Sequence, residues 1–190
     1  MTSNFTVLYD SCVLYSNHLR DILIQLALTD LFRAKWTNII HEEWIRNLLK
    51  NRPDLQIEQL TQVKNLMNSK VRDCLITDLE QLIPFLDLPD PNDCHVLAAA
   101  IVAQVDVIVT FNLKDFPASA ISPYGVEAKH PDDFLADLID LNPLKVIAVV
   151  ETCRTRLKKP PKTFDEYLEI LLKQELTTSV SMLKELRGKI

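Results

Sequence analysis

Residues 88–116, LPDPNDCHVLAAAIVAQVDVIVTFNLKDF, carry a marked helix start, a helix of small side chains and a buried strand. Asp90 can cap the helix, and Pro91 suits its first turn, where the missing N–H group has no partner to lose. The alanines at 98–100 allow this helix to lie close against a sheet. Residues 105–110, VDVIVT, have the β-branched composition of a buried strand. The stretch therefore predicts a helix that covers a sheet and leads into one of its strands.

The same alternation of strands and helices extends over the first 129 residues. Residues 5–9, FTVLY, form a second apolar, β-rich run, and short runs near Leu75 and Val126 are candidates for edge strands. The spacing of apolar side chains predicts helices at 17–32, 38–50 (with Thr37 as N-cap), 57–69 and 79–86. Strands that alternate with helices indicate an α/β fold with a mostly parallel central sheet.

From about residue 130 the pattern changes to consecutive short helices with no strand between them. Prolines at 143, 160 and 161 separate these helices. We therefore expect two parts, residues 1–129 and a small all-helical C-terminal extension at 130–190. About 60 residues form only a marginal core of their own, so this extension is not expected to be self-sufficient.

The 190-residue chain has the composition of a soluble globular protein, with 47% hydrophobic and 25% charged residues. No apolar run approaches the roughly 18 residues that a membrane-spanning helix needs. The N-terminus lacks a basic stretch followed by an apolar core, so we expect a cytoplasmic protein with no membrane partner. The formal net charge is −5, with the acidic excess in residues 1–129. That balance disfavours nonspecific nucleic-acid binding by a basic surface, but bound metal would cancel part of it in a nucleic-acid enzyme.

The cysteines and glycines argue against other kinds of site. The four cysteines lie far apart without a C-x-x-C pair, so a cysteine-based zinc site is not expected. Reduced cysteines suit the cytoplasm, and Cys12 is interpreted as a small buried filler instead of a nucleophile. Only two glycines occur, which leaves no known phosphate-cradling loop or dinucleotide fingerprint.

Four acidic residues stand at the edges of predicted core elements: Asp10, Glu43, Asp93 and Asp115. Asp10 and Asp115 follow strand-like runs, and in α/β sheets ligands bind beyond the carboxyl ends of the strands. Carboxylates that meet raise each other's pKa values, and a divalent cation that prefers hard oxygen ligands removes that penalty. We therefore predict a site for Mg²⁺ or Mn²⁺ that supports hydrolysis of a phosphodiester bond.

Each of these acids also has a structural interpretation. Asp10 could be a turn or cap residue, and Asp115 a loop acid. Asp93 in a first helical turn stabilises the helix by about 0.3–1 kcal/mol whatever its function. Glu43 lies beside the apolar face of its helix, where a carboxylate is rarely buried without a partner, while Glu42 is expected to face solvent. The functional interpretation depends on the four acids taken together.

The chain resembles the PIN-domain nucleases, and in particular the VapC-like toxins of bacterial type II toxin–antitoxin pairs. The matching segments are VLYDSCVL at 7–14, the Thr37–Glu43 spacing, LPDPNDCHVLAAAI at 88–101 and VTFNLKDFP at 109–117. The last two are the most specific, because apolar context, spacing and polar residues all agree. The resemblance implies a PIN-like three-layer α/β sandwich over residues 1–129. The helices of 130–190 look like the extension found in one PIN subgroup.

The resemblance also implies the roles of the site residues. The catalytic acids of the family hold one or two Mg²⁺ or Mn²⁺ ions, and the matching positions are Asp10, Glu43, Asp93 and Asp115. Of these, Asp10 and Asp93 are expected to be the main direct ligands. The supporting polar positions are Thr110, Asn112 and Asp90, and helix capping is the first role of Asp90.

The implied activity is that of a metal-dependent endoribonuclease, and the implied partners are RNA and a cognate antitoxin protein. A basic side chain of the antitoxin would suit a cluster of carboxylates. The apolar helices at 17–32 and in the C-terminal region are compatible with a homodimer. The candidate contacts to the RNA backbone are Arg46, Lys50, Arg52 and Lys114. The basic run RTRLKKPPK at 154–162 is a second candidate patch for RNA, although a solvated helix end and linker is the favoured interpretation.

Other functional classes fit the sequence less well. An aspartyl phosphatase would need a second aspartate at position 12, where this chain has Cys12. The serious alternative is a catalytically silent PIN-like module that binds RNA or protein. Loss of an acid would be its signature, and all four acids are present. His41 is expected at the surface or near a helix cap, and His95 in a structural or supporting position.

Overall fold

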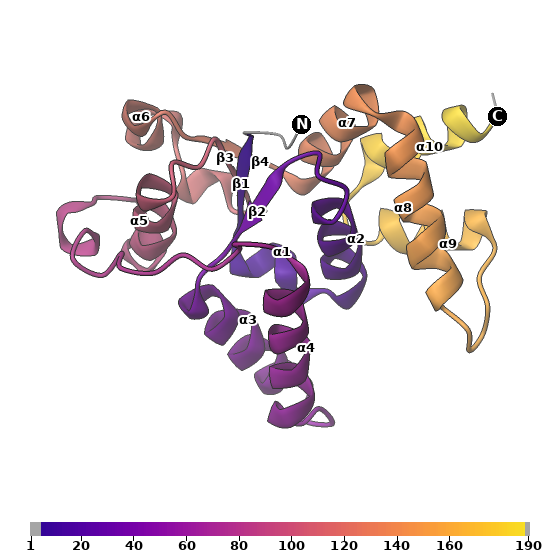
Figure 1. Cartoon of the computed structure of the whole chain (residues 1–190), viewed down its shortest axis with the longest axis horizontal. Coiled ribbons are helices and arrows are strands. Elements are labelled where there is room, and N and C mark those ends of the chain that lie inside the picture. Colours follow the sequence, from indigo (N-terminus) through magenta and orange to yellow (C-terminus); the bar gives the residue numbers. More distant parts are fainter. Residues whose placement is uncertain (1–4, 189–190) are drawn as a thin grey trace.

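The computed structural model describes residues 5–188, and at its centre is a four-stranded sheet in which every pair of neighbours is parallel (Figure 1). The strand order is β2-β1-β3-β4, and the strands are β1 (Thr6–Tyr9), β2 (Arg33–Lys35), β3 (Val107–Val109) and β4 (Glu127–Lys129). The two central strands are buried along their whole length, whereas the edge strands are partly exposed. The predicted α/β class with a parallel central sheet is confirmed.

Helices lie on both sides of this sheet, which gives three layers. In Figure 1, α5 and α6 lie to the left of the sheet, α2 and the C-terminal helices lie to its right, and α3 and α4 extend below as a pair. No helix within residues 5–188 is long and apolar enough to span a membrane. The helices are α1 (Ser11–Tyr15), α2 (Asn17–Ala27), α3 (Asn38–Asn51), α4 (Ile57–Lys70), α5 (Cys94–Val102), α6 (Ala118–Ile121), α7 (Pro131–Leu141), α8 (Pro143–Arg156), α9 (Phe164–Leu172) and α10 (Thr177–Arg187).

The register between β1 and β3 determines which side chains meet at the end of the sheet. Val7 lies opposite Val107, and Tyr9 opposite Val109. The pairing continues one step further, because the Asp10 N–H group donates to the Val109 carbonyl oxygen at 3.1 Å. The residues that follow the two strands, far apart in the sequence, therefore lie next to each other at the carboxyl edge.

Two expected helices differ from the structure. The helix predicted for 17–32 is wrong at its end: α2 stops at Ala27, Asp30 takes a turn conformation with φ +58°, and residues 33–35 form the edge strand β2. Leucines continue the helical spacing to position 31, but the chain turns at 28–32, and residues 33–35, directly after the predicted helix, pair with β1. The helix predicted for 79–86 is reduced to a single 3-10 turn, Ile83–Phe85, around a proline.

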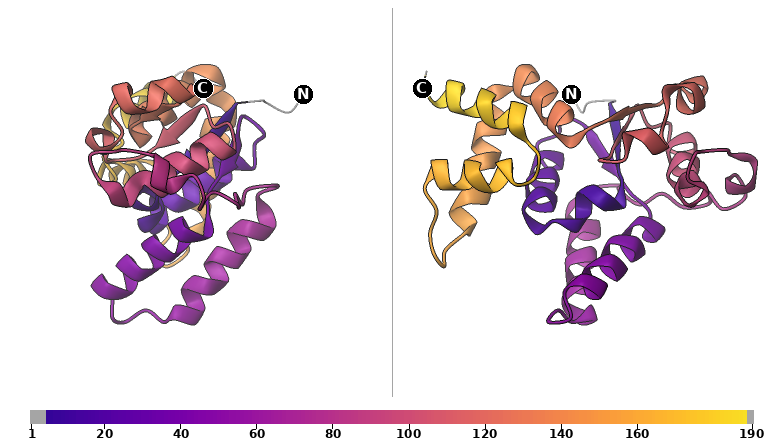
Figure 2. Two further views of the ribbon diagram at one scale, coloured as in Figure 1. Left: turned by 90° about the vertical axis from the view of Figure 1, so that its left-hand side faces the viewer. Right: turned by 180° about the vertical axis from the view of Figure 1, so that it is seen from behind.

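The C-terminal helices are confirmed as an all-helical part, and they share one continuous core with the sheet and α2. Figure 2 shows them gathered beside α2. The Phe134 ring of α7 meets the Phe32 ring edge-on, with centroids 5.2 Å apart. Arg156 at the end of α8 forms an ion pair with Asp21 of α2 at 2.8 Å. The extension therefore buries its apolar faces against the first part of the chain.

Asp132 connects α7 to the start of α10. Its carboxylate accepts hydrogen bonds from the backbone N–H groups of Thr178 and Ser179, both at 2.8 Å, and from the Ser179 hydroxyl at 2.7 Å. Burial by itself raises the pKa of Asp132, but the hydrogen bonds from Ser179 and Thr178 outweigh burial and leave the pKa below its usual range. The ionised side chain thus caps a helix 46 residues further along the chain.

We expect Asp132→Ala to lower the free energy of unfolding by about 2–4 kcal/mol, because it removes a helix cap and leaves buried N–H groups unpaired. Urea unfolding followed by circular dichroism measures this loss. Asp133→Ala is the matched control, because Asp133 is exposed in the same helical turn. The contribution of Asp132 is present above about pH 4 and is lost as pH falls through its lowered folded pKa. Equal losses in the two variants would contradict this role.

Candidate functional site

Asp10 lies where the central strand β1 ends, and its carboxylate is almost fully buried, with 3% of the residue exposed. One oxygen, Oδ1, accepts the Ser11 N–H at 2.6 Å, so Asp10 caps α1 as well. The other oxygen, Oδ2, accepts the Thr110 hydroxyl at 2.7 Å and the Cys12 thiol at 3.1 Å. These contacts fix the carboxylate in one orientation at the carboxyl end of the sheet.

The neighbours of Asp10 are themselves held in place. Thr110 is fully buried after β3, and its hydroxyl oxygen accepts the Asn112 N–H at 3.0 Å. The Cys12 sulfur accepts the Phe111 N–H at 3.3 Å. Burial, and then the charge of Asp10, raise the pKa of the Cys12 thiol to about 12, so the thiol stays protonated and can donate. Cys12 is therefore a polar partner of the site, a role that its interpretation as a filler missed.

Glu43 and His95 bring α3 against the start of α5. The His95 Nε2 atom lies 2.9 Å from Glu43 Oε1. His95 is two residues beyond Asp93 and buried in the first turn of α5, so this contact brings Glu43 to the end of the helix that carries Asp93. Glu43 is partly exposed and Glu42 is exposed, as the sequence predicted for the solvent-facing neighbour.

Asp93 lies at the junction of the 3-10 turn Pro91–Asp93 and α5. Burial, and then the charges of Asp10, Asp90, Asp115 and Glu43 in that order, together raise the pKa of Asp93 to about 7. Repulsion between carboxylates acts over short distances, so its sources must lie near Asp93. The fold thus brings all four predicted acids, and Asp90 with them, to one end of the sheet.

The remaining polar positions lie in the turns before α5 and after β3. Asp90 caps the turn before α5, as predicted, with Oδ1 accepting the Asn92 backbone and side-chain N–H groups at 2.9 Å. Asp115 is partly exposed in the 3-10 turn Leu113–Asp115 that follows β3. Asn112 is exposed at the start of that turn.

The donor set suits Mg²⁺ or Mn²⁺, because it consists of carboxylate oxygens, some of them partly exposed, whose mutual repulsion a cation would relieve. Within residues 5–188, however, no three His, Cys, Asp or Glu side chains are arranged so that they could hold one metal ion. The acids are near enough to raise the pKa of Asp93 but are not closed around a common point. Binding of a shared ion would draw the carboxylates closer together than they lie here.

His41 is buried, so the expectation that it could lie at the surface is wrong, whereas the alternative of a position near a helix cap is confirmed, because its backbone N–H group donates to the carbonyl oxygen of the N-cap Thr37. Its Nδ1 accepts the Trp44 indole N–H at 3.0 Å, and its Nε2 lies 3.0 Å from Asn68 Oδ1. Burial lowers the pKa of His41 to about 4, so the ring is neutral at pH 7. This histidine joins α3 to α4 and does not reach the acids or a phosphate.

The predicted RNA contacts lie on the surface. Arg46 and Lys50 are on the exposed side of α3, and Lys114 is exposed next to Asp115. Arg52 is already engaged, with two hydrogen bonds to the carboxylate of Asp54 at 2.8 and 2.7 Å. Three of the four cations are thus available to a ligand without first leaving an ion pair within the part of the chain that the structure describes.

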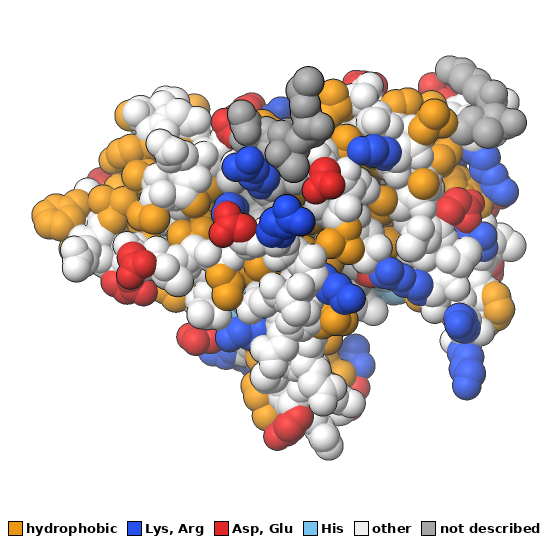
Figure 3. All heavy atoms as spheres, in the orientation of Figure 1, with side chains coloured by type: hydrophobic (Ala, Val, Ile, Leu, Met, Phe, Trp, Pro, Cys, Tyr) orange, Lys and Arg blue, Asp and Glu red, His pale blue; other side chains and the backbone are white. Residues whose placement is uncertain are grey.

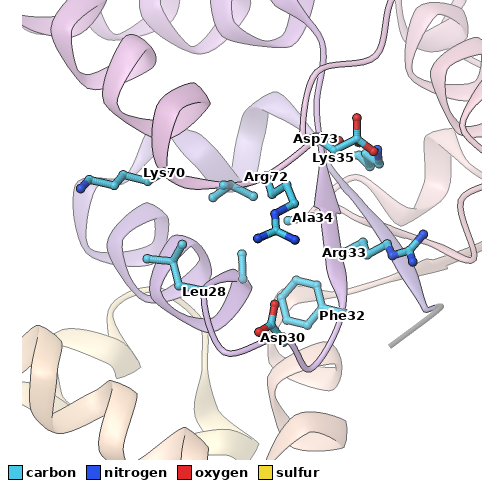
Figure 4. Close-up of a pocket in the computed structure, with 11 residues that line it drawn as sticks. Leu28, Asp30, Phe32, Arg33, Ala34, Lys35, Lys70, Arg72 and Asp73 are labelled. Carbon is cyan, nitrogen blue, oxygen red and sulfur yellow. Dashed lines mark hydrogen bonds and ion pairs between the residues drawn. The ribbon is translucent and has the colours of Figure 1, made fainter. Parts of the chain in front are cut away.

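A separate hollow of about 450 Å³ lies along the edge strand β2 and is lined by none of these acids (Figure 4). Arg72 points into it, toward Phe32 and Asp30, whereas Lys35 forms an ion pair with Asp73 at 3.0 Å. Figure 3 shows basic and acidic side chains interspersed over the middle of this face. Charges along an edge strand discourage pairing with other chains, and we assign the basic residues here that protective role.

Comparison with known proteins agrees with this arrangement. A family model described as "PIN domain" matches residues 6–114, and a model described as "VapC50 C-terminal domain" matches residues 131–185. A protein of Mycobacterium tuberculosis named "Putative ribonuclease VapC50" is 45% identical over 83 residues, which are 44% of this chain and 49% of that protein. The matched region thus spans about half the length of that relative. No solved structure matches the chain.

The match to the PIN model covers more than half of the chain and includes Asp10, Glu43 and Asp93. The resemblance inferred from the sequence motifs is thereby confirmed at the level of the family. The helical part that follows the sheet has its own match, to the C-terminal domain of a VapC protein. The chain belongs to the PIN domain family.

Proposed function

We propose that this protein is a metal-dependent endoribonuclease that hydrolyses RNA phosphodiester bonds and acts as the toxin of a bacterial toxin–antitoxin pair. The observation that carries the proposal is geometric: the Asp10 carboxylate is fixed beside Thr110, and Glu43 is held against the start of α5 next to Asp93. The PIN family and the name of the relative, a ribonuclease, support it.

The four acids have different proposed roles in holding the cation. Asp10 and Asp93 are the proposed main ligands, and Glu43 and Asp115 complete the site. Bound Mg²⁺ or Mn²⁺, as one or two ions, supplies charge that polarises a phosphate oxygen and lowers the pKa of a water molecule. Thr110 and the backbone of Asn112 keep Asp10 oriented, so that its carboxylate needs no rearrangement when a ligand arrives.

RNA would lie across the exposed cations beside the acids. Lys114, next to Asp115, is nearest to them in sequence, and Arg46 and Lys50 extend the contact along α3. Arg52 could join only by exchanging Asp54 for a phosphate. Splayed bases of single-stranded or structured RNA would then face the protein.

A cognate antitoxin with a basic side chain would fit the same acids, because four carboxylates attract a guanidinium strongly.

We further propose that residues 1–129 are the nuclease domain and residues 130–190 its helical extension. The apolar helices are also compatible with a homodimer. The cytoplasm is the proposed location, since the four cysteines are all free.

Loss of either of the two proposed main ligands should strongly reduce RNA cleavage. Asp10→Asn and Asp93→Asn should each lower RNA cleavage by at least about 100-fold, because each removes a charge that holds the cation. Cleavage of a mixed cellular RNA pool is measured with Mg²⁺, with Mn²⁺ and with EDTA. Glu43→Gln and Glu42→Gln form a matched pair, and only the former should lose activity. Undiminished cleavage by either folded aspartate variant would refute the assignment. Binding of RNA without any cleavage would favour the silent module.

The raised pKa of Asp93, caused first by burial and then by the neighbouring carboxylates, makes stability depend on pH. In EDTA, the difference in unfolding free energy between Asp93→Asn and wild type should shift in favour of the variant as pH rises from 5 to 8. Folded Asp93, with a pKa of about 7, is neutral at pH 5 and charged at pH 8, whereas in the unfolded chain it is charged throughout this range.

The pH trend is the quantity to compare, because replacing Asp93 also changes the unfolding free energy by an amount that does not depend on pH. Urea unfolding at each pH supplies the values. Adding Mn²⁺ should reverse the preference at pH 8, since the ion stabilises only the chain that binds it. A difference that does not change with pH would contradict the raised pKa of Asp93.

A further inference from the structure

The hydrogen bond between Glu43 and His95 lies next to a buried, otherwise apolar stretch of α5. His95 lies in the first turn of α5, with 7% of the residue exposed, and the residues that follow it, Val96, Leu97 and the alanines at 98–100, are buried and apolar. Its Nε2 atom is 2.9 Å from Glu43 Oε1. Glu43 belongs to α3, more than 50 residues earlier, so the bond joins two helices that approach the site from different directions.

The other ring nitrogen of His95 has no partner. Within residues 5–188, Nδ1 of His95 is the single buried side-chain nitrogen or oxygen atom that forms no hydrogen bond. An unpaired buried polar atom costs stability, and an apolar side chain at this position would avoid that cost. Glu43 is therefore the one hydrogen-bond partner of the ring among the described residues, and the packing of the core does not by itself call for a histidine here.

Only one of the two carboxylate oxygens of Glu43 accepts this hydrogen bond. An ionised carboxylate only accepts hydrogen bonds, so the hydrogen of this contact is on Nε2. Oε1 is thus occupied, while no described residue donates to Oε2, and about a fifth of the side chain is open to solvent. A glutamate has three rotatable bonds, and fixing one oxygen removes most of that freedom before any ligand binds. Asp10 is held in a similar way by Thr110 and Cys12.

We propose that His95 is a positioning residue that holds the Glu43 carboxylate in the orientation in which its free oxygen can bind a divalent cation. The inference rests on the proposed metal-dependent function, because it concerns the same acids. Groups that hold metal-binding side chains typically change metal affinity by about 10- to 100-fold when they are lost. His95 would act on the cation only through Glu43.

The test is the affinity for Mn²⁺, measured by isothermal titration calorimetry on the full chain without RNA. His95→Leu and His95→Met remove the hydrogen bond and should weaken Mn²⁺ binding about 10- to 100-fold. His95→Gln places an amide N–H near the position of Nε2 and should restore most of the affinity. His18→Leu, on α2, is the matched control and should leave the affinity unchanged.

Two further measurements separate positioning from a structural role. Thermal unfolding in EDTA should show the Leu and Met variants at least as stable as wild type, because they remove the unpaired Nδ1. In a Glu43→Gln background, His95→Leu should cause no further loss of Mn²⁺ affinity, because the group that His95 positions is already gone.

The outcomes distinguish this inference from the proposed function. Unchanged Mn²⁺ affinity in His95→Leu and His95→Met, with wild type binding the ion, overturns the role of His95 alone. Losses that add to those of Glu43→Gln, or that glutamine does not restore, also overturn it. Wild-type protein that binds no Mn²⁺ overturns the proposed function, and the inference with it.

Discussion

The parallel pairing of β1 with β3 is the constraint on which the rest of this structure depends. The two strands are completely buried, are separated by about 100 residues, and match in a register that leaves Asp10 and Thr110 side by side at their carboxyl ends. Parallel strands need crossover connections, and here the connections are the helices that cover both sides of the sheet. The same crossovers deliver Glu43 and Asp93 to the carboxyl edge, because α3 and α5 start or pass there.

Gathering carboxylates at one edge works against stability, and the protein limits the cost with hydrogen-bond donors. Thr110 and Cys12 hydrogen-bond to Asp10, and His95 to Glu43, while burial keeps Cys12 protonated. Asp93 has no such partner within residues 5–188, and it is the acid whose pKa is raised to about 7. The cost of ionising a buried carboxylate beside other carboxylates thus falls mainly on Asp93, at the start of α5. Such costs are common where function and stability compete.

The C-terminal helices are not an appendage on a flexible linker. Phe134 inserts beside Phe32, Arg156 pairs with Asp21, and Asp132 caps α10 from the first turn of α7. About 60 residues of helix bury too little apolar surface on their own, and the contact with α2 supplies the missing part. Because α2 also covers the sheet, the helical part stabilises the same core on which the acidic edge is built.

The sequence alone determined the class of fold, the helical C-terminal part and the positions of the acids. Apolar, β-rich runs, the helical spacing of apolar residues, the caps at Thr37 and Asp90, and the motif around Asp93 are local signals, and the structure retains them. The edge strand Arg33–Lys35 was missed, because its backbone partner lies in β1 and leucines nearby continue a helical spacing. Only the tertiary structure decided that Cys12 would bond Asp10, that His41 would be buried between two tryptophans, and that His95 would meet Glu43. These contacts join residues from separate elements, and no pattern within either element specifies which side chain it will meet across the core.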